Sequence, residues 1–208
     1  DRSTPVVSFQ MWVNAGSKDE SFYTGIAHLF EHMMFKGSKN VGPEEHARLI
    51  GARGGEVNAF TTQDVTVYHE DVTSESLPLV IDLEAERLAN LDISQKTLDS
   101  EREVVLEERR MRTETRPGGL ALEALFGLTW QALPYRWPVI GWRSDVAAVT
   151  VAACREFFDT YYSANNIVIV VVGDFDTAET VAHIERAFGG IRSADRKSTR
   201  LNSSHELT

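Results

Sequence analysis

Alternation of apolar and polar residues along the chain predicts several β-strands. Residues 6–13 are rich in β-branched and aromatic side chains, which is typical of a strand. Residues 56–72 alternate over a longer stretch, and this pattern predicts two strands joined by a turn near residues 62–64. Residues 166–172 are mostly β-branched without interruption, which predicts a buried strand.

Between these strands the apolar positions recur at helical spacing. The first helix is expected over about residues 25–36, with Thr24 as its N-cap and Gly37 at its end. Pro43 is expected at the first position of a second helix, which closes at the glycine pair 54–55. The remaining helices are predicted over residues 74–90, 94–113, 120–133, 150–162 and 176–190. In the helix 120–133, the expected core side consists of Leu122, Leu125, Phe126 and Trp130.

Composition is that of an ordinary globular protein and restricts the classes of partner. The chain has 208 residues, of which 42% are hydrophobic and 25% charged. Its formal net charge of −10 disfavours nucleic acid and anionic membranes as partners. The longest apolar run, residues 167–172, is too short to span a bilayer. Cys154 is the single cysteine, so the chain has no internal disulfide.

The two ends of the chain suggest where the folded domain lies. Residues 5–14 already have the pattern of a strand, so the domain is expected to be truncated at its start. Residues 195–208 are polar, lack periodicity and resemble the translation of a sequencing adapter more than natural protein. We therefore predict one domain over residues 1–192 and a disordered tail over residues 195–208, in which His205 has no functional role.

Candidate chemistry first appears in the helix 25–36, which contains the pattern H-x-x-E-H. His28, Glu31 and His32 share one helical face because residues three and four apart are neighbours on a helix. Two imidazoles on one face can hold a zinc ion, and a nearby carboxylate can take a proton from water. The alternative is a solvated polar face. The many apolar neighbours favour burial, which polar side chains tolerate only with a metal or a hydrogen-bond network.

The helix 94–113 has a second unusual feature. Glu101 and Glu108 fall within about 80° of Leu98 on a helical wheel, on the same stripe as Val105. Carboxylates on an apolar stripe indicate either a metal or catalytic network, or salt bridges at the edge of the core. The salt-bridge alternative stays open because several arginines are close by: Arg102, Arg109, Arg110 and Arg112.

The other histidines of the folded region suggest no site by themselves. His46, in the second predicted helix, is expected to be a solvated surface residue. His69, in a predicted strand, is expected to be partly exposed.

Five segments together resemble the pitrilysin-type zinc metallopeptidases, whose H-x-x-E-H order is called inverzincin. The similarity covers residues 1 to about 192 and is closest to the branch of the mitochondrial processing peptidase β subunit and its bacterial relatives. The segments are HLFEHMMFKGS, GGEVNAFTTQDVTVYHEDV, SEREVVLEERR, PYRWPVIGWRSDV and YYSANNIVIVVVGDFD.

The resemblance implies a fold and a set of site residues. The implied fold is α+β, with a largely antiparallel β-sheet packed against helices. The implied zinc ligands are His28, His32 and Glu108, with water as the fourth. Glu31 is implied to be the general base, and Glu101 a second carboxylate that orients or assists.

The resemblance also implies how a substrate would bind. Residues 58–60, which are Asn58, Ala59 and Phe60, are expected on a strand beside the zinc. An extended peptide could add to that strand by backbone hydrogen bonds. Asn58 would then contact the peptide, although a simple strand-end role is the alternative. Members of the family need a homologous C-terminal domain or second subunit to complete the site.

Three readings of function follow. The first is a zinc-dependent endopeptidase domain that cleaves peptides or unfolded proteins. The second is a non-catalytic scaffold or partner subunit of the same family, and the third is a metal-binding module without hydrolysis. The presence of all four of His28, Glu31, His32 and Glu108 favours the first. The sequence leaves substrate and compartment open, with a bacterial cytoplasm or periplasm as the expectation.

Overall fold

The computed structural model of the chain describes residues 2–194. The tail predicted to be disordered, residues 195–208, lies outside the described residues. No helix of the described part is both long and apolar enough to cross a membrane.

Four antiparallel strands form one sheet in the order β2-β3-β1-β4. Their bounds are β1 (Val6–Val13), β2 (Glu56–Thr61), β3 (Thr66–Thr73) and β4 (Ile167–Gly173). β2 and β3 form the predicted hairpin, in which Thr61 pairs with Thr66 across the turn. Both sheet partners of β1 are distant in sequence, because β1 pairs with β3 on one side and β4 on the other.

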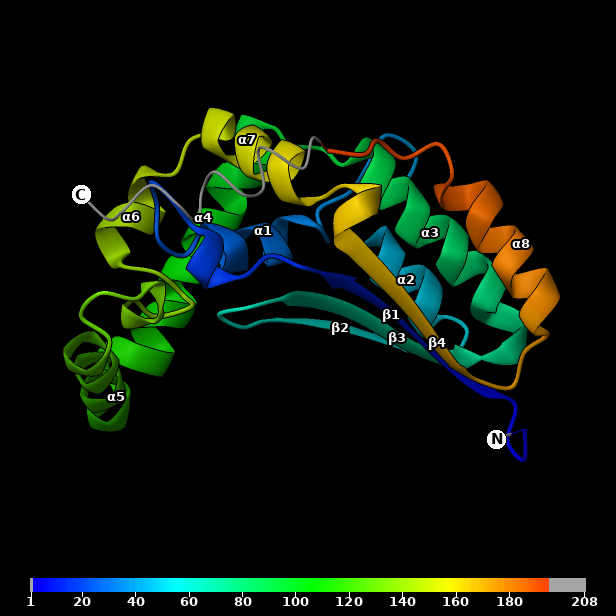
Figure 1. The fold of residues 1–208 in the computed structure, drawn as a ribbon, viewed down its shortest axis with the longest axis horizontal. Helices are drawn as coiled ribbons and strands as arrows, with labels where there is room; N and C mark the ends of the chain where they lie inside the picture. The colour runs from blue at the N-terminus through cyan, green and yellow to red at the C-terminus, as the bar shows by residue number, and fades with distance from the viewer. Residues whose placement is uncertain (1, 195–208) are drawn as a thin grey trace.

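Most helices cover one face of this sheet, and α5 projects away from that layer beyond the hairpin end of β2 and β3 (Figure 1). This layering is the predicted α+β class, which is confirmed. Short 3-10 turns lie at Ser17–Asp19, Ser74–Ser76, Pro134–Arg136 and Ala164–Asn166, and a π-helical segment at Arg110–Glu114. The helices are α1 (Ile26–Met33), α2 (Glu45–Gly51), α3 (Leu77–Asn90), α4 (Gln95–Arg109), α5 (Pro117–Thr129), α6 (Arg143–Ala148), α7 (Val151–Tyr161) and α8 (Thr177–Phe188).

The core lies between the sheet and the helical layer. Alternate residues of β1, such as Phe9 and Met11, point toward the helices and are fully buried. On α1, Leu29, Phe30 and Met33 are also fully buried. Each such side chain contributes roughly 1.5–3 kcal/mol of transfer free energy, so this packing fixes α1 against the sheet.

The start of α1 is set differently from the prediction. The expected N-cap, Thr24, instead donates its hydroxyl to Asp145 Oδ2 at 2.8 Å. The carboxylate of Glu20 accepts from the backbone N–H groups of Gly25 and Ala27, at 2.9 and 3.0 Å. Gly25 has a φ of 87° and lies so close to Gly141 that a Cβ would clash with the backbone of that loop. The helix therefore begins at Ile26, and it ends at Met33 rather than near Gly37.

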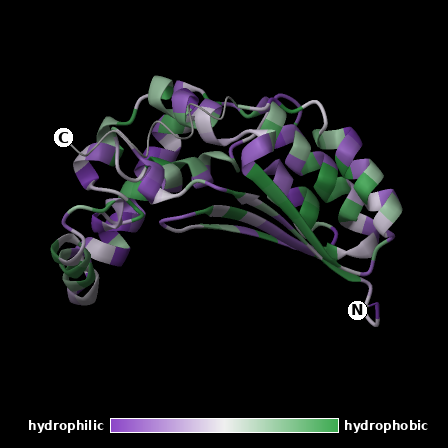
Figure 2. Ribbon diagram, viewed as in Figure 1, coloured by the Kyte–Doolittle hydropathy of each residue, from purple (hydrophilic) through white to green (hydrophobic). Residues whose placement is uncertain are grey.

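The predicted burial of β4 and of the helix α5 is wrong. β4 is an edge strand rather than a buried one, and its outward residues Val168 and Val172 are each 61% exposed. Figure 2 shows its apolar run as a continuous green strand. None of the residues of α5 is buried, and the leucines expected in the core are exposed, with Leu122 at 56% and Leu125 at 57%.

An ion pair links α5 to the rest of the domain. Glu123 points inward and pairs with Arg109, whose NH1 lies 2.9 Å from Glu123 Oε2. Arg109 is buried and also donates to the carbonyl of Gly141 at 2.8 Å. This ion pair directs the one charged residue of α5 toward the domain, while the leucines Leu120, Leu122, Leu125 and Leu128 stay exposed. The predicted core side of this helix is therefore wrong, because α5 is apolar nearly all round and none of its residues is buried.

Candidate metal centre

The helices α1 and α4 bring the predicted site residues together. α1 presents His28, Glu31 and His32 on one face, and each offers a ligand atom within 4.8 Å of the others. α4, which packs against α1, carries Glu101 and Glu108 on the facing stripe. The helical spacing of both motifs is thus realised on two adjacent helices.

Glu108 Oε2 is the point at which the two histidines converge. It lies 3.3 Å from His32 Nε2 and 3.8 Å from His28 Nε2. Two ligand atoms of a tetrahedral zinc ion, each about 2.0–2.1 Å from the metal, are about 3.4 Å apart. Both histidine–glutamate distances are near this separation, and the N, N, O donor set is one that zinc commonly accepts.

The charges around His32 favour a cation. Burial lowers its pKa, but the nearby carboxylates of Glu101 and Glu108 outweigh that effect and raise the pKa to about 9. His28, by contrast, has its pKa lowered to about 4 by burial and by the proximity of His32. His28 is thus neutral, which is the form that binds a metal. The carboxylates around His32 favour a positive charge there, which either a proton or a metal ion can supply.

Glu101 and Glu108 are each held by a second cation. Lys36 Nζ lies 3.2 Å from Glu101 Oε1, and Arg112 NH1 lies 2.6 Å from Glu108 Oε1. Glu101 Oε2 is 3.8 Å from His32 Nδ1, on the opposite side of the ring from Glu108. The two carboxylates thus lie near the two different nitrogens of the His32 ring.

Glu31 is held from the sheet rather than from a helix. Thr61, the last residue of β2, donates its hydroxyl to Glu31 Oε2 at 2.5 Å. Burial raises the pKa of Glu31 above its ordinary value, and the hydrogen bond from Thr61 partly opposes this. A carboxylate with a raised pKa is a better proton acceptor from water than an ordinary one.

The predicted substrate segment lies on the edge strand that packs against α1. Among the described residues β2 pairs only with β3, so its outer edge is open. Asn58 and Phe60 face away from the helical layer, and Ala59 faces toward it. Phe60 is 42% exposed, and its ring meets Trp12 edge-on at 6.3 Å. Asn58 Oδ1 accepts from the backbone N–H of Ala59, which is a local strand role.

A second histidine and carboxylate cluster was missed by sequence reasoning. His46, predicted to be solvated, is 5% exposed, and its Nε2 lies 3.4 Å from Glu70 Oε1 and 3.6 Å from Glu84 Oε1. Arg87 completes this cluster through close contact with Glu84 and a distance of 3.6 Å to Glu70. The prediction failed because the partners come from β3 and α3, and no local spacing connects them to α2. His69 is partly exposed, as predicted.

Sequence comparison places the chain among known peptidases. A profile described as insulinase (peptidase family M16) matches residues 1–141, and one described as peptidase M16 inactive domain matches residues 148–206. The zinc protease PqqE of Helicobacter pylori is 30% identical over 198 residues, covering 95% of this chain and 45% of that protein. An uncharacterized zinc protease of Mycobacterium leprae is 37% identical, covering 97% of this chain and 47% of that protein.

Solved structures give the same picture. A protease from Helicobacter pylori superposes with a TM-score of 0.90 at 30% identity, covering 93% of this chain and 47% of that one. Pitrilysin superposes with a TM-score of 0.83 at 25% identity, covering 94% of this chain and 22% of that one. The chain spans about half the length of the curated relatives it matches.

Proposed function

The chain belongs to the insulinase family of peptidases, family M16, and on this premise we propose that it is a zinc-dependent endopeptidase domain. The observation that carries the proposal is the convergence of His28 and His32 on Glu108 Oε2, with Glu31 on the same helical face. The proposed metal ligands and the proposed general base thus lie close together on two adjacent helices.

His28, His32 and Glu108 would hold the zinc ion. When bound, zinc supplies Lewis-acid polarisation of the substrate carbonyl and makes water more acidic. Glu31 takes the proton from the attacking water and then delivers it to the departing amine. Glu101 holds His32 in orientation from its other side, and Lys36 holds Glu101.

Substrate would bind along β2. The open edge of this strand can accept an extended peptide through backbone hydrogen bonds, in register with Asn58, Ala59 and Phe60. Thr61, which ends the strand, contacts Glu31, so a peptide on this edge passes the catalytic carboxylate. The open edge of β2 would bind the backbone of the peptide, and backbone hydrogen bonds do not depend on the side chains of the substrate.

A second domain or subunit is proposed to complete the site. Two apolar surfaces support this: the leucines of α5 and the outward valines of β4. α5 projects beyond the helical layer, toward the side of the sheet that the helices leave uncovered (Figure 1). The curated relatives are about twice as long as this chain, and a partner of homologous fold would supply the missing cover.

Zinc content and chelator-sensitive cleavage test the proposal together. We expect about one zinc per chain by elemental analysis, lost in His28→Ala and Glu108→Gln, and peptide cleavage by the complete protein that a chelator abolishes. A folded protein that contains no zinc and cleaves no peptide would instead support a scaffold role.

A further inference from the structure

Thr61 makes a hydrogen bond to Glu31, and the proposed mechanism gives the Thr61 hydroxyl no role in catalysis. Its Oγ1 lies 2.5 Å from Glu31 Oε2. An ionised carboxylate only accepts hydrogen bonds, so the hydroxyl must be the donor. Among the hydrogen bonds of the described residues, this is the one that engages the Glu31 carboxylate.

The proton of Thr61 has no competing acceptor of equal quality. The nearest other hydroxyl, that of Thr66, lies 3.4 Å away. Thr66 donates its own proton to the carbonyl of Ala15 at 3.0 Å. A charged acceptor at 2.5 Å outweighs a neutral one at 3.4 Å, so the Thr61 hydroxyl is directed at Glu31.

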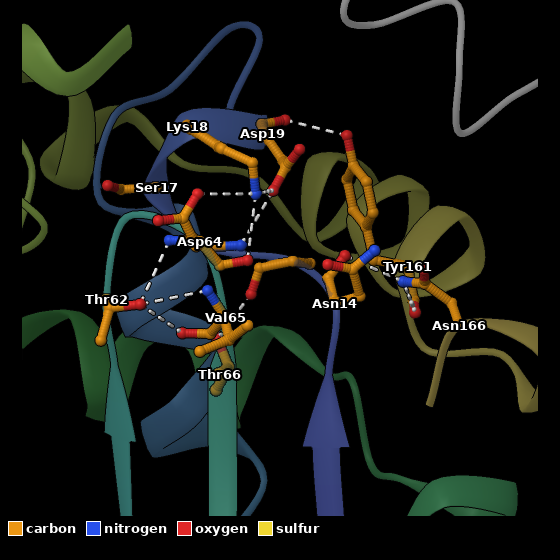
Figure 3. A network of polar contacts seen from close by, with 12 residues as sticks. Asn14, Ser17, Lys18, Asp19, Thr62, Asp64, Val65, Thr66, Tyr161 and Asn166 are labelled. Carbon is orange, nitrogen blue, oxygen red and sulfur yellow. Dashed lines mark hydrogen bonds and ion pairs between the residues drawn. The ribbon is translucent and has the colours of Figure 1, made fainter. Parts of the chain in front are cut away.

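Thr61 is itself held in place by the end of the hairpin. In the turn that follows, Thr62 Oγ1 accepts from the N–H groups of Asp64 and Val65, both at 3.1 Å. Figure 3 shows this turn beside the segment that follows β1. Lys18 Nζ donates to the carbonyl of Asp64 at 3.0 Å and lies 3.4 Å from its carboxylate.

Backbone contacts fasten the same turn. The N–H groups of Ser17 and Lys18 donate to the carbonyls of Thr62 and Gln63, at 3.1 and 2.9 Å. At Gly16 a Cβ would lie 2.5 Å from those carbonyl oxygens, so the approach requires glycine. The turn thus has little freedom to move, and Thr61 has little freedom to withdraw from Glu31.

We propose that Thr61 is a positioning residue for Glu31. Its hydroxyl binds Oε2 and fixes the rotation of the carboxylate, which leaves Oε1 as the oxygen that takes the proton from water. This inference rests on the proposed role of Glu31 as general base. The Glu31 side chain belongs to the helix α1, but its orientation is then set by the β2–β3 hairpin of the sheet.

The alternative is that Thr61 has only a structural role. Two variants distinguish this alternative from a positioning role. Thr61→Val removes the hydroxyl and keeps the shape, whereas Thr61→Ser keeps the hydroxyl. Thr73→Val is the matched control, because Thr73 lies at the other end of the hairpin and contacts Ser76 rather than Glu31. The readouts are the crystal structure of each variant and kcat and KM for a fluorogenic peptide in the complete protein.

We expect Thr61→Val to lower kcat by about 10- to 100-fold with little change in KM or zinc content, because a mispositioned base loses part of its effect. Its Glu31 carboxylate should be rotated or spread over several positions. Thr61→Ser should recover most of kcat, and Thr73→Val should match the parent. An unchanged Glu31 orientation and kcat in Thr61→Val would overturn the proposal. A parent without zinc or activity would refute the peptidase function, while the Glu31 orientation in the variant structures would still decide the role of Thr61.

Discussion

Two clusters of histidine and glutamate lie in this domain, and they differ in what balances their charge. The first contains His28, His32 and Glu108, with side chains 12%, 23% and 14% exposed. The second contains His46, Glu70 and Glu84, which are buried almost completely. Both offer one imidazole or more and carboxylate oxygens at similar separations.

The second cluster already contains its cation. The Arg87 guanidinium contacts Glu84, and its Nε donates to Glu84 Oε2 at 3.0 Å. It also lies over the rings of Phe35 and Tyr68, at 5.0 and 4.5 Å from their centroids. A divalent ion placed beside this guanidinium would add positive charge to a site without solvent, which is unfavourable.

The first cluster has its cations only at the periphery. Lys36 and Arg112 bind the outer oxygens of Glu101 and Glu108, and the side facing both histidines is free of a basic side chain among the described contacts. The comparison teaches that ligand spacing alone does not mark a metal site. We propose that the position of the nearest guanidinium or ammonium distinguishes the two clusters.

The largest expected effect is on catalysis at the first cluster. Glu31→Gln should retain zinc but lower peptide hydrolysis by about 10³- to 10⁴-fold, because the amide cannot take a proton from water. Steady-state assays of the complete protein, with zinc measured on the same samples, would check this. Glu84→Gln, at the second cluster, is the matched variant and should leave kcat within about twofold once folded. A Glu31→Gln variant of near-parental activity would remove Glu31 from the mechanism.

Removal of Arg87 should instead affect stability. Arg87→Met leaves two buried carboxylates without their cation and should lower the free energy of unfolding by about 3–5 kcal/mol. The double variant Arg87→Met with Glu84→Leu should recover most of this loss, because an apolar pair then replaces the ion pair. Urea unfolding of the zinc-free chain would measure both. Equal destabilisation of the single and double variants would show that packing, rather than unpaired charge, dominates.

Zinc should stabilise the chain through the first cluster alone. At a free zinc concentration one hundred times Kd, the stabilisation is about 2.7 kcal/mol. Thermal unfolding with and without a chelator should show this shift in the parent and in Glu84→Gln, but not in Glu108→Gln. A zinc-dependent shift that survives in Glu108→Gln and disappears in Glu84→Gln would reverse the assignment of the two clusters.

A smaller effect is expected from pH at the second cluster. Burial, together with the charge of Arg87, lowers the pKa of His46 to about 4, against 6.5 for an ordinary histidine. Between these values the unfolded chain binds a proton that the folded chain excludes, so His46 makes stability fall as pH falls. From pH 7 to pH 5 this contribution is about 2 kcal/mol.

His46→Leu should remove that contribution. The difference in free energy of unfolding between parent and variant should therefore change by about 2 kcal/mol from pH 7 to pH 5. Glu70 has the opposite sign, because burial and the charge of Glu84 raise its pKa, and a raised pKa makes stability fall as pH rises. His183→Gln, at the surface beside Asp82, is the control. Parallel stability curves for parent and His46→Leu would show that His46 does not titrate in this way.

The sequence predicted the first cluster because its signals are local. His28, Glu31 and His32 follow helical spacing, and Glu101 and Glu108 occupy one stripe of a single helix. The family resemblance then predicted that these two helices contribute to one site. β1 was predicted with its observed bounds, and Thr150 and Asp176 cap α7 and α8 as expected.

What escaped prediction depends on contacts between distant segments. His46 is buried because Glu70 and Glu84 approach it from β3 and α3. The leucines of α5 are exposed because, among the described residues, no other element covers them, and Glu123 pairs with Arg109 of α4. Thr61 carries no periodic signal, and its importance emerges only from its contact with Glu31. Amphipathic patterns identify an apolar face but do not specify what covers it.

The most direct test is a crystal of the chain soaked in zinc, with anomalous scattering recorded on both sides of the zinc absorption edge. One experiment then examines both clusters in the same molecule. The account predicts a single strong peak, about 2.0–2.2 Å from a ligand atom of each of His28, His32 and Glu108, and no peak among His46, Glu70 and Glu84. A peak in the second cluster, or none in the first at saturating zinc, would contradict it.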